Sequence, residues 1–282
     1  MATTNFHGLR VLALESRRAQ EISKLILNSG GIPLVVPSVR ELPLESNTRP
    51  IEFVRKLREG GFHVVIFMTG VGVQLLARIA EGVYPISEFA TLLSRTITVA
   101  RGPKPLAALR QIGVTATLTV PEPNTWHDLL SELDNRHGEI PLDGKRVVLQ
   151  EYGVSNPELV DALQQRGAEV SCVPVYEWKL PEDTAPLRRA VDDVINGDID
   201  VILVTASVQI RHLFQVAETA GKKDALLEAM KRTVLTSIGP LCSEEIQKHG
   251  LSVDLEPSHP KMGFLVMEAA EKSGSLLHQK RQ

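Results

Sequence analysis

The sequence has 282 residues, of which 43% are hydrophobic and 23% are charged, with a formal net charge of −3. Domains usually hold about 100–200 residues, so this length predicts two of them. The composition excludes a disordered chain and a protein that coats nucleic acid. No apolar run reaches the roughly 18 residues of a membrane span, and residues 1–10 lack an apolar signal segment. We therefore expect a cytoplasmic protein without membrane or nucleic-acid partners.

Short apolar runs alternate with segments of helical periodicity along the whole chain. The first half predicts five strands, at Arg10–Leu14, Ile32–Pro37, Val64–Met68, Thr96–Ala100 and Val114–Thr119. The second half predicts five more, at Arg146–Gln150, Glu169–Val175, Val201–Val204, Thr233–Ser237 and Ser252–Leu255. Amphipathic segments such as Ala19–Asn28 and Pro157–Arg166 lie between them, each followed closely by a glycine. Nearly continuous Val/Ile/Leu strands joined by helices indicate parallel sheets that are covered on both faces.

The two halves repeat one pattern. Gly8-Leu9-Arg10-Val11 matches Gly144-Lys145-Arg146-Val147, and the register then holds within one residue over much of each half. The matched pairs further along are Gly30 with Gly167, Pro37 with Pro174, Thr69 with Thr205, and Gly102-Pro103 with Gly239-Pro240. Such self-similarity indicates an internal duplication. We therefore predict two flavodoxin-like, doubly wound α/β domains.

Sheets of this kind bind ligands at the carboxyl ends of their strands, where loops lead into helices. Thr69-Gly70-Val71-Gly72 and Thr205-Ala206-Ser207 place small and hydroxyl residues at helix starts, where free backbone N–H groups bind anions. Cations lie in neighbouring loops, at Arg17, Arg18, Arg101 and Lys104, the last two around Gly102-Pro103. Gly239-Pro240 forms the equivalent turn in the second half. Each arginine is either solvated surface or an anion ligand, and the convergence of these loops on sheet edges favours an anionic ligand.

The sequence lacks the usual signatures of hydrolases, nucleotide-binding proteins and zinc proteases. Gly70-Val71-Gly72 has no third glycine and is better interpreted as a tight turn than as a dinucleotide site. The histidines lack metal-ligand spacing, and Cys172, inside the apolar run Val170–Val175, is expected to be a small core residue. The two cysteines, Cys172 and Cys242, support neither a disulfide framework nor a thiolate zinc site. Tyr152 and Tyr176 follow strands, where a phenol either packs or donates a proton to a ligand. We therefore expect neither a metal nor a cofactor.

The paired units that end in Val35-Val36-Pro37 and Val173-Pro174-Val175-Tyr176, together with the Ile238-Gly239-Pro240 turn, resemble the uroporphyrinogen-III synthases. The resemblance covers about residues 8–272. Glu15-Ser16-Arg17-Arg18 and Met68-Thr69-Gly70-Val71-Gly72 look like a divergent bacterial branch of that family. The chain departs from the family at Leu241 and Cys242, where hydroxyl residues are common.

The resemblance implies two domains joined by extended connectors near Ser38–Pro43 and Tyr176–Pro181. One domain would be discontinuous, with residues 1–38 plus 177–282, and the other would hold residues 40–175. The family substrate is hydroxymethylbilane, a linear tetrapyrrole with many carboxylates. The family cyclises it without a cofactor, with loss of water and inversion of the last pyrrole ring through a spiro intermediate, in tetrapyrrole (haem) biosynthesis.

On this resemblance Tyr176 is the candidate acid for departure of the hydroxyl, and loops at the carboxyl edges of both sheets would bind the substrate. The candidate binding residues are Arg17, Arg18, Arg40, Thr69, Gly70, Val71, Gly72, Arg101, Gly102, Lys104, Tyr152, Thr205, Ala206, Ser207, Gly239 and Pro240. We expect a monomer. Two alternatives remain: a non-catalytic regulator that binds a tetrapyrrole or another small anion, and an unrelated tandem α/β binding protein of the solute-binding type.

Overall fold

The computed structural model describes residues 5–43, 48–153 and 155–282. The chain divides into two compact units. Unit 1 contains Met1–Arg40 and Lys179–Gln282, and unit 2 contains Glu41–Trp178. The sequence places the joins at residues 38–40 and 175–177, beside these boundaries. Each unit therefore draws its residues from both sequence halves.

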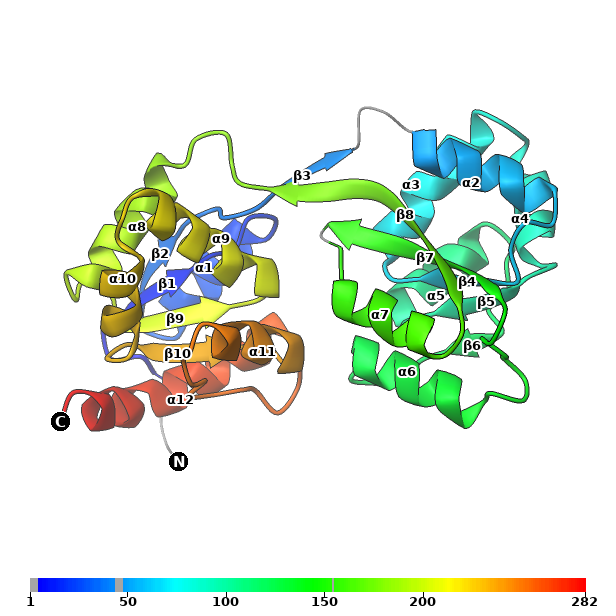
Figure 1. The fold of residues 1–282 in the computed structure, drawn as a ribbon. Helices are drawn as coiled ribbons and strands as arrows, with labels where there is room; N and C mark the ends of the chain where they lie inside the picture. The colour runs from blue at the N-terminus through cyan, green and yellow to red at the C-terminus, as the bar shows by residue number, and fades with distance from the viewer. Residues whose placement is uncertain (1–4, 44–47, 154) are drawn as a thin grey trace. The chain divides into compact units, whose positions relative to one another are not determined.

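Four parallel strands form the sheet of unit 1, in the order β10-β9-β1-β2. They are β1 (Arg10–Ala13), β2 (Ile32–Val35), β9 (Val201–Val204) and β10 (Val234–Ser237). One face of the sheet packs against α1 (Ala19–Asn28) and α12 (Met262–Lys280). The other face packs against α8 (Ala185–Ile195), α9 (Ser207–Thr219), α10 (Lys223–Met230) and α11 (Pro240–Lys248) (Figure 1).

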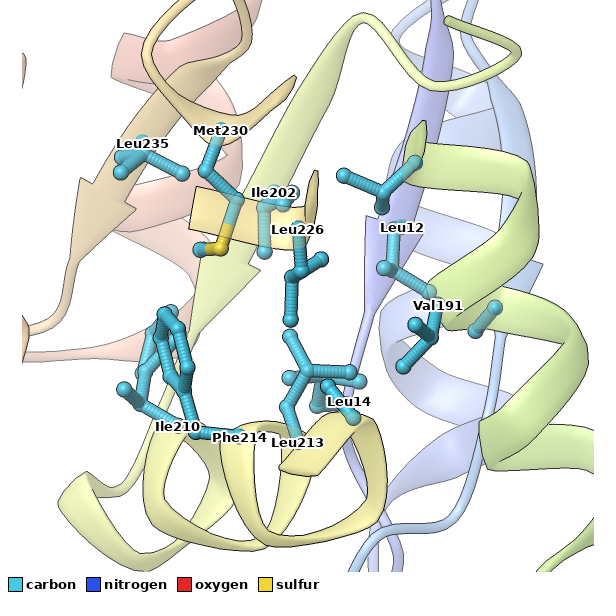
Figure 2. Close-up of a cluster of buried hydrophobic side chains, with 14 of the residues drawn as sticks. Leu12, Leu14, Val191, Ile202, Ile210, Leu213, Phe214, Leu226, Met230 and Leu235 are labelled. Atoms are coloured by element: carbon cyan, nitrogen blue, oxygen red, sulfur yellow. The ribbon is translucent and has the colours of Figure 1, made fainter. Parts of the chain in front are cut away.

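Figure 2 shows the core on the second of these faces, where side chains of the sheet meet side chains of α8, α9 and α10. The sheet contributes Leu12, Ile202 and Leu235, Leu14 follows β1, and the helices contribute Val191, Ile210, Leu213, Phe214, Leu226 and Met230. Burying one such side chain typically stabilises a fold by about 1.5–3 kcal/mol. This cluster therefore fixes the end of β1 and the start of α9, which carry the loops of interest.

Unit 2 contains a six-stranded sheet in the order β3-β8-β7-β4-β5-β6. Its strands are β3 (Arg40–Pro43), β4 (Val64–Phe67), β5 (Ile97–Ala100), β6 (Leu118–Thr119), β7 (Arg146–Gly153) and β8 (Glu169–Lys179). One face packs against α2 (Thr48–Arg58), α3 (Gly70–Glu81), α4 (Ile86–Leu93) and α5 (Pro103–Gln111). The other face packs against α6 (Trp126–Asn135) and α7 (Pro157–Gln165) (Figure 1).

The two sheets share one spatial arrangement of strands. In unit 1, counted from β1, the strands follow the flavodoxin order, in which the second strand lies outside the first and the third strand lies on its other side. Unit 2 has this arrangement in circularly permuted order, because β4, β5 and β6 precede β7 and β8 in the chain. The order reverses between β1 and β9 in unit 1 and between β7 and β4 in unit 2. Ligands of doubly wound sheets bind beside such switch points. The predicted α/β fold class, with two parallel sheets, is confirmed.

Two predicted strands are wrong or shortened, and side chains explain both differences. Ser252–Leu255 is not a strand, because the Asp254 carboxylate accepts the Leu235 N–H at 2.7 Å and only Leu255 forms a bridge, to Thr236. The predicted strand Val114–Thr119 is reduced to Leu118–Thr119, since the Thr117 hydroxyl accepts the Thr98 N–H at 3.2 Å. In both places a side-chain oxygen replaces the carbonyl of a neighbouring strand. The short β3 and the end of β8 occupy the segments that the sequence assigns to connectors.

Candidate functional site

The turn after β4, at the switch point of unit 2, begins α3. Thr69 is its N-cap residue in an extended conformation, and the Thr69 Oγ1 accepts the Gly72 N–H at 3.0 Å. Threonine is favoured at such positions because its hydroxyl satisfies an amide that the helix cannot. The expectation of free amides is therefore wrong for Gly72, whose N–H is bonded within the chain. We call Thr69–Gly72 the Thr69 turn.

Strand β8 brings Tyr176 to the same turn. The phenol oxygen of Tyr176 lies 3.2 Å from the Thr69 Oγ1, and the side chain is only 4% exposed. Because the Thr69 Oγ1 already accepts from Gly72, its own O–H is available to donate to the phenol oxygen. The positive end of the α3 dipole also favours negative charge at this place. The arrangement suits a phenol that gives up a proton and is stabilised as a phenolate.

A buried carboxamide lies beneath the turn, and it is not among the predicted site residues. Gln150, at 0% exposure in β7, accepts the Thr69 N–H with its Oε1 at 3.4 Å and donates from its Nε2 to the Glu151 carbonyl. A Cβ at Gly72 would lie 2.2 Å from the Gln150 Nε2, so only glycine allows this approach. The signal that could have revealed Gln150 is a polar residue at the end of an apolar strand.

The turn after β5 lies against the Thr69 turn. A Cβ at Gly70 would lie 2.8 Å from the carbonyl oxygen of Lys104, which places the first turns of α3 and α5 in close contact. Gly102 is the N-cap residue of α5 and packs against the side chain of Asn124. The Asn124 amide nitrogen, in the orientation that satisfies its neighbours, donates to the Arg101 carbonyl at 3.2 Å. The structure therefore brings together the predicted residues of these two turns, with Lys104 exposed and Arg101 half-buried.

The turn after β9, at the switch point of unit 1, is occupied by the chain itself. Gln209 Oε1 accepts the N–H groups of Thr205 and Ala206 at 2.8 and 3.2 Å, and its Nε2 donates to the Thr205 Oγ1 at 2.8 Å. The prediction of free amides is wrong here too. The N-cap residue of α9 is Ala206, so Thr205 lies one residue earlier relative to its helix than Thr69 does. We call Thr205–Ser207 the Thr205 turn.

Glu15, in the loop after β1, binds the Thr205 turn at the same switch point. Its Oε1 accepts the N–H groups of Arg17 and Arg18, both at 3.1 Å, and its Oε2 accepts the Thr205 hydroxyl at 2.5 Å. The amides at the start of α1 thus already bind a carboxylate of the chain. The Arg18 guanidinium pairs with Glu21, and the Arg40 guanidinium pairs with Glu182. These contacts give Arg18 and Arg40 structural partners within unit 1.

The turn after β10 combines Gly239 and Pro240 with a buried thiol. Gly239 is the N-cap residue of α11, and its N–H donates to the Ser237 hydroxyl at 3.2 Å. Burial raises the pKa of Cys242 to about 12. Burial, followed by the proximity of Glu151, raises the pKa of Cys172 to about 12 as well. Both thiols therefore stay neutral. Cys242 is buried in the core of unit 1, whereas Cys172 is partly buried against a core cluster of unit 2.

Tyr152 lies in β7, and its side chain is outside the described part of the structure. Among residues 5–43, 48–153 and 155–282, no three His, Cys, Asp or Glu side chains gather in a way that could hold a metal ion. Within the same ranges, no helix combines the length and apolar character that a membrane crossing requires.

Comparisons with known proteins found a matching family and two similar relatives. The family model described as "Uroporphyrinogen-III synthase HemD" matches residues 20–267. The "Uncharacterized protein YjjA" of Bacillus subtilis strain 168 is 29% identical over 266 residues, covering 94% of this chain and 96% of that protein. A protein of Methanothermobacter thermautotrophicus named "Putative uroporphyrinogen-III synthase" is 28% identical over 236 residues, covering 83% of this chain and 87% of its own length.

Solved structures show the same architecture. A mutant uroporphyrinogen III synthase of the extremely thermophilic bacterium Thermus thermophilus matches with a TM-score of 0.73 at 22% identity, covering 95% of this chain and 100% of that chain. The wild-type enzyme in another crystal form matches with a TM-score of 0.58 at 24% identity, covering 95% and 99%. At these identities the likeness concerns the fold alone.

Proposed function

The chain belongs to the uroporphyrinogen-III synthase family, and we propose that it cyclises hydroxymethylbilane to uroporphyrinogen III, with inversion of the last pyrrole ring and loss of water. The observation that carries the proposal is the 3.2 Å contact between the Tyr176 phenol and the Thr69 hydroxyl at the start of α3. As part of the same proposal, the protein acts in tetrapyrrole biosynthesis in the cytoplasm, as a monomer and without a cofactor.

Tyr176 is the proposed acid. The C–O bond of the substrate's hydroxymethyl group breaks with its electron pair on oxygen, the phenol proton moves to that oxygen, and water leaves. The pyrrole nitrogen supplies the electrons that replace the lost bond and keeps its proton, which gives an electrophilic azafulvenium cation beside the phenolate. The Thr69 O–H and the α3 dipole stabilise the phenolate. The proton that the attacked ring loses during closure restores the phenol.

Holding the substrate is the larger part of the proposed catalysis. The substrate's own rings supply nucleophile and electrophile, so the protein must fix a flexible polyanion in one geometry. Arg101 and Lys104 flank the turn that packs against the Thr69 turn, so they are the cations that we propose for substrate carboxylates in unit 2. Charge-assisted contacts of this kind weaken as salt screens them. Substrate affinity is therefore expected to fall with ionic strength.

The experiment is a product-resolved assay. Hydroxymethylbilane is generated enzymatically in the presence of the purified protein, and the type I and type III uroporphyrinogens are separated after oxidation. We expect the type III isomer to exceed the amount formed with heat-denatured protein at the same concentration. Type I product alone, at protein concentrations well above that of the substrate, would contradict the cyclase. If the substrate still bound in that case, the non-catalytic tetrapyrrole-binding role would be favoured.

A further inference from the structure

We propose that Gln150 is a positioning residue, which fixes the backbone of Thr69 and thereby the contact between the Thr69 hydroxyl and the Tyr176 phenol. The kinetic consequences rest on the proposed function. The structural consequence, a defined place for the Tyr176 hydroxyl, does not.

The carboxamide of Gln150 is held on several sides. Its strand neighbours are Phe67 in β4 and Val173 in β8, and the side chain has no exposed surface. Its oxygen faces the Thr69 N–H and its nitrogen faces the Glu151 carbonyl, so the orientation of the amide follows from its partners. The backbone of Gly72 lies directly against it. The amide therefore supports the first turn of α3 from below.

The other unit shows that the fold does not need a polar residue at this place. Leu14 follows Val11 by three residues, as Gln150 follows Val147, and Leu14 is also fully buried, within the apolar cluster of Figure 2. Burying an amide costs free energy unless its hydrogen bonds are made. Unit 1 has leucine here because the matching Thr205 N–H is accepted by Gln209 in α9. In unit 2 the acceptor for this N–H is Gln150, and its partner Thr69 is the residue that contacts the phenol.

The proposed effect passes through Thr69. With Gln150 replaced by leucine, the Thr69 N–H loses its acceptor and the first turn of α3 loses the support of the amide beneath Gly72. The Thr69 hydroxyl would then shift relative to the Tyr176 oxygen. A misplacement of about 1 Å at a reacting group can cost about 10²-fold in rate.

The kinetic test uses Gln150→Leu in the presence and absence of Tyr176→Phe. We expect Gln150→Leu alone to lower kcat by about 10- to 100-fold with KM within about twofold. In the Tyr176→Phe background the same change is expected to alter kcat by less than about twofold, because both substitutions act on one proton transfer. Equal reductions in both backgrounds, or an effect confined to KM, would overturn the positioning role. Gln150→Met, unbranched and similar in length, replaces Gln150→Leu if leucine prevents folding.

Thr98→Val is the matched control for buried polarity. Thr98 is 1% exposed in β5 of the same sheet, and its hydroxyl donates to the Leu93 carbonyl at 3.2 Å. Its loss is expected to destabilise unit 2 without changing kcat. A reduction of kcat equal to that of Gln150→Leu would identify the effect of Gln150 as general destabilisation and overturn the proposal.

A spectroscopic test needs no turnover. The sequence contains three tyrosines, so ¹³Cζ-tyrosine labelling gives a simple spectrum, in which Tyr176→Phe assigns the Tyr176 signal. We expect Gln150→Leu and Thr69→Val to move this signal, and Thr98→Val to leave it in place. An unmoved signal in Gln150→Leu would overturn the positioning role even in an active enzyme. A moved signal in a protein that forms no type III product would refute the proposed function and keep the positioning role.

Discussion

The two switch points share a topology and differ in the side chains that fill them. In unit 1 the Glu15 carboxylate accepts the Thr205 hydroxyl and two amides at the start of α1. In unit 2 the matching Glu151 carboxylate accepts the Ser155 hydroxyl at 2.6 Å, and the Thr69 hydroxyl contacts the Tyr176 phenol instead of a carboxylate. A negative charge already fixed at one turn disfavours a second one there. Under the proposed function, the comparison therefore favours unit 2 as the place of proton transfer.

The two units also differ at the amino ends of their central strands, away from the switch-point loops. In unit 1 the Asp200 carboxylate accepts the Arg10 N–H at 2.9 Å and also binds the Arg10 guanidinium. In unit 2 the Nδ1 of His63 accepts the Arg146 N–H at 3.1 Å. A carboxylate and an imidazole lose this acceptor role at different pH. As the pH falls, unit 2 should therefore lose stability at a higher pH than unit 1.

The largest expected effect comes from Tyr176→Phe. Phenylalanine keeps the ring that packs in unit 2 and removes only the proton donor, so type III formation should fall by about 10²–10⁴-fold in kcat. Tyr84→Phe, beyond the far end of α3, is the control and should keep its activity. A Tyr176→Phe rate within about twofold of wild type would assign the tyrosine a packing role only.

Asp200→Asn tests how much the Asp200 carboxylate, at the amino end of β9, stabilises unit 1. Burial acts to raise the pKa of Asp200, but hydrogen bonds from Arg10 and Arg281 outweigh it, so the net pKa lies below the ordinary carboxyl value. The stabilisation is full above the unfolded pKa of about 3.9 and is lost as pH falls through the lower folded value. At neutral pH the substitution should lower the free energy of unfolding by about 1–3 kcal/mol.

Hydrogen exchange of unit 1 amides is the measurement for Asp200→Asn, because Trp126 and Trp178, the two tryptophans, both lie in unit 2. The variant should also lose less stability between neutral pH and about pH 3 than the wild type does. Parallel acid profiles for the two proteins would contradict the role of Asp200.

Glu15→Gln tests whether the negative charge of Glu15 strengthens its hydrogen bonds at the Thr205 turn. The glutamine oxygen can still accept an amide, but charge-assisted bonds become neutral ones, which are roughly half as strong. We expect a loss of about 0.5–1.5 kcal/mol, seen as faster exchange of the amides of Arg17 and Arg18. Unchanged exchange at these amides would show that the carboxylate contributes no protection there.

The smallest effect is expected from His63→Gln. Desolvation, followed by the charges of Arg146 and Lys145, lowers the pKa of His63 in the folded protein. Its contribution is therefore full above the unfolded value of about 6.5 and is lost as pH falls through the lower folded pKa. Glutamine retains an acceptor for the Arg146 N–H, so the variant should flatten the pH dependence of the tryptophan-detected Tm between about pH 7.5 and 5. A slope equal to that of wild type would contradict this role.

The fold was accessible from the sequence because strand and helix periodicity and the repeat agree at every level. The strand-end rule also selected Thr69, and the position of Tyr176 after a strand selected the phenol. Gln150, Gln209 and Glu15 were not assigned, since their hydrogen bonds join different elements or depend on rotamers that spacing does not encode. For Gln150 the usable signals were a polar residue at the end of an apolar strand and its contrast with Leu14 within the repeat.

Proton transfer in unit 2 requires that the Thr69 and Thr205 hydroxyls contribute unequally to catalysis. A side-by-side assay of Thr69→Val and Thr205→Val tests this most directly. Both variants lose one hydroxyl at a switch point, and both are assayed for type III product at a temperature where they are folded. We predict that Thr69→Val lowers kcat by about 10²-fold, as loss of a donor to a developing anion does, and that Thr205→Val lowers it at least about tenfold less. An equal or larger loss in Thr205→Val would contradict the assignment of proton transfer to unit 2.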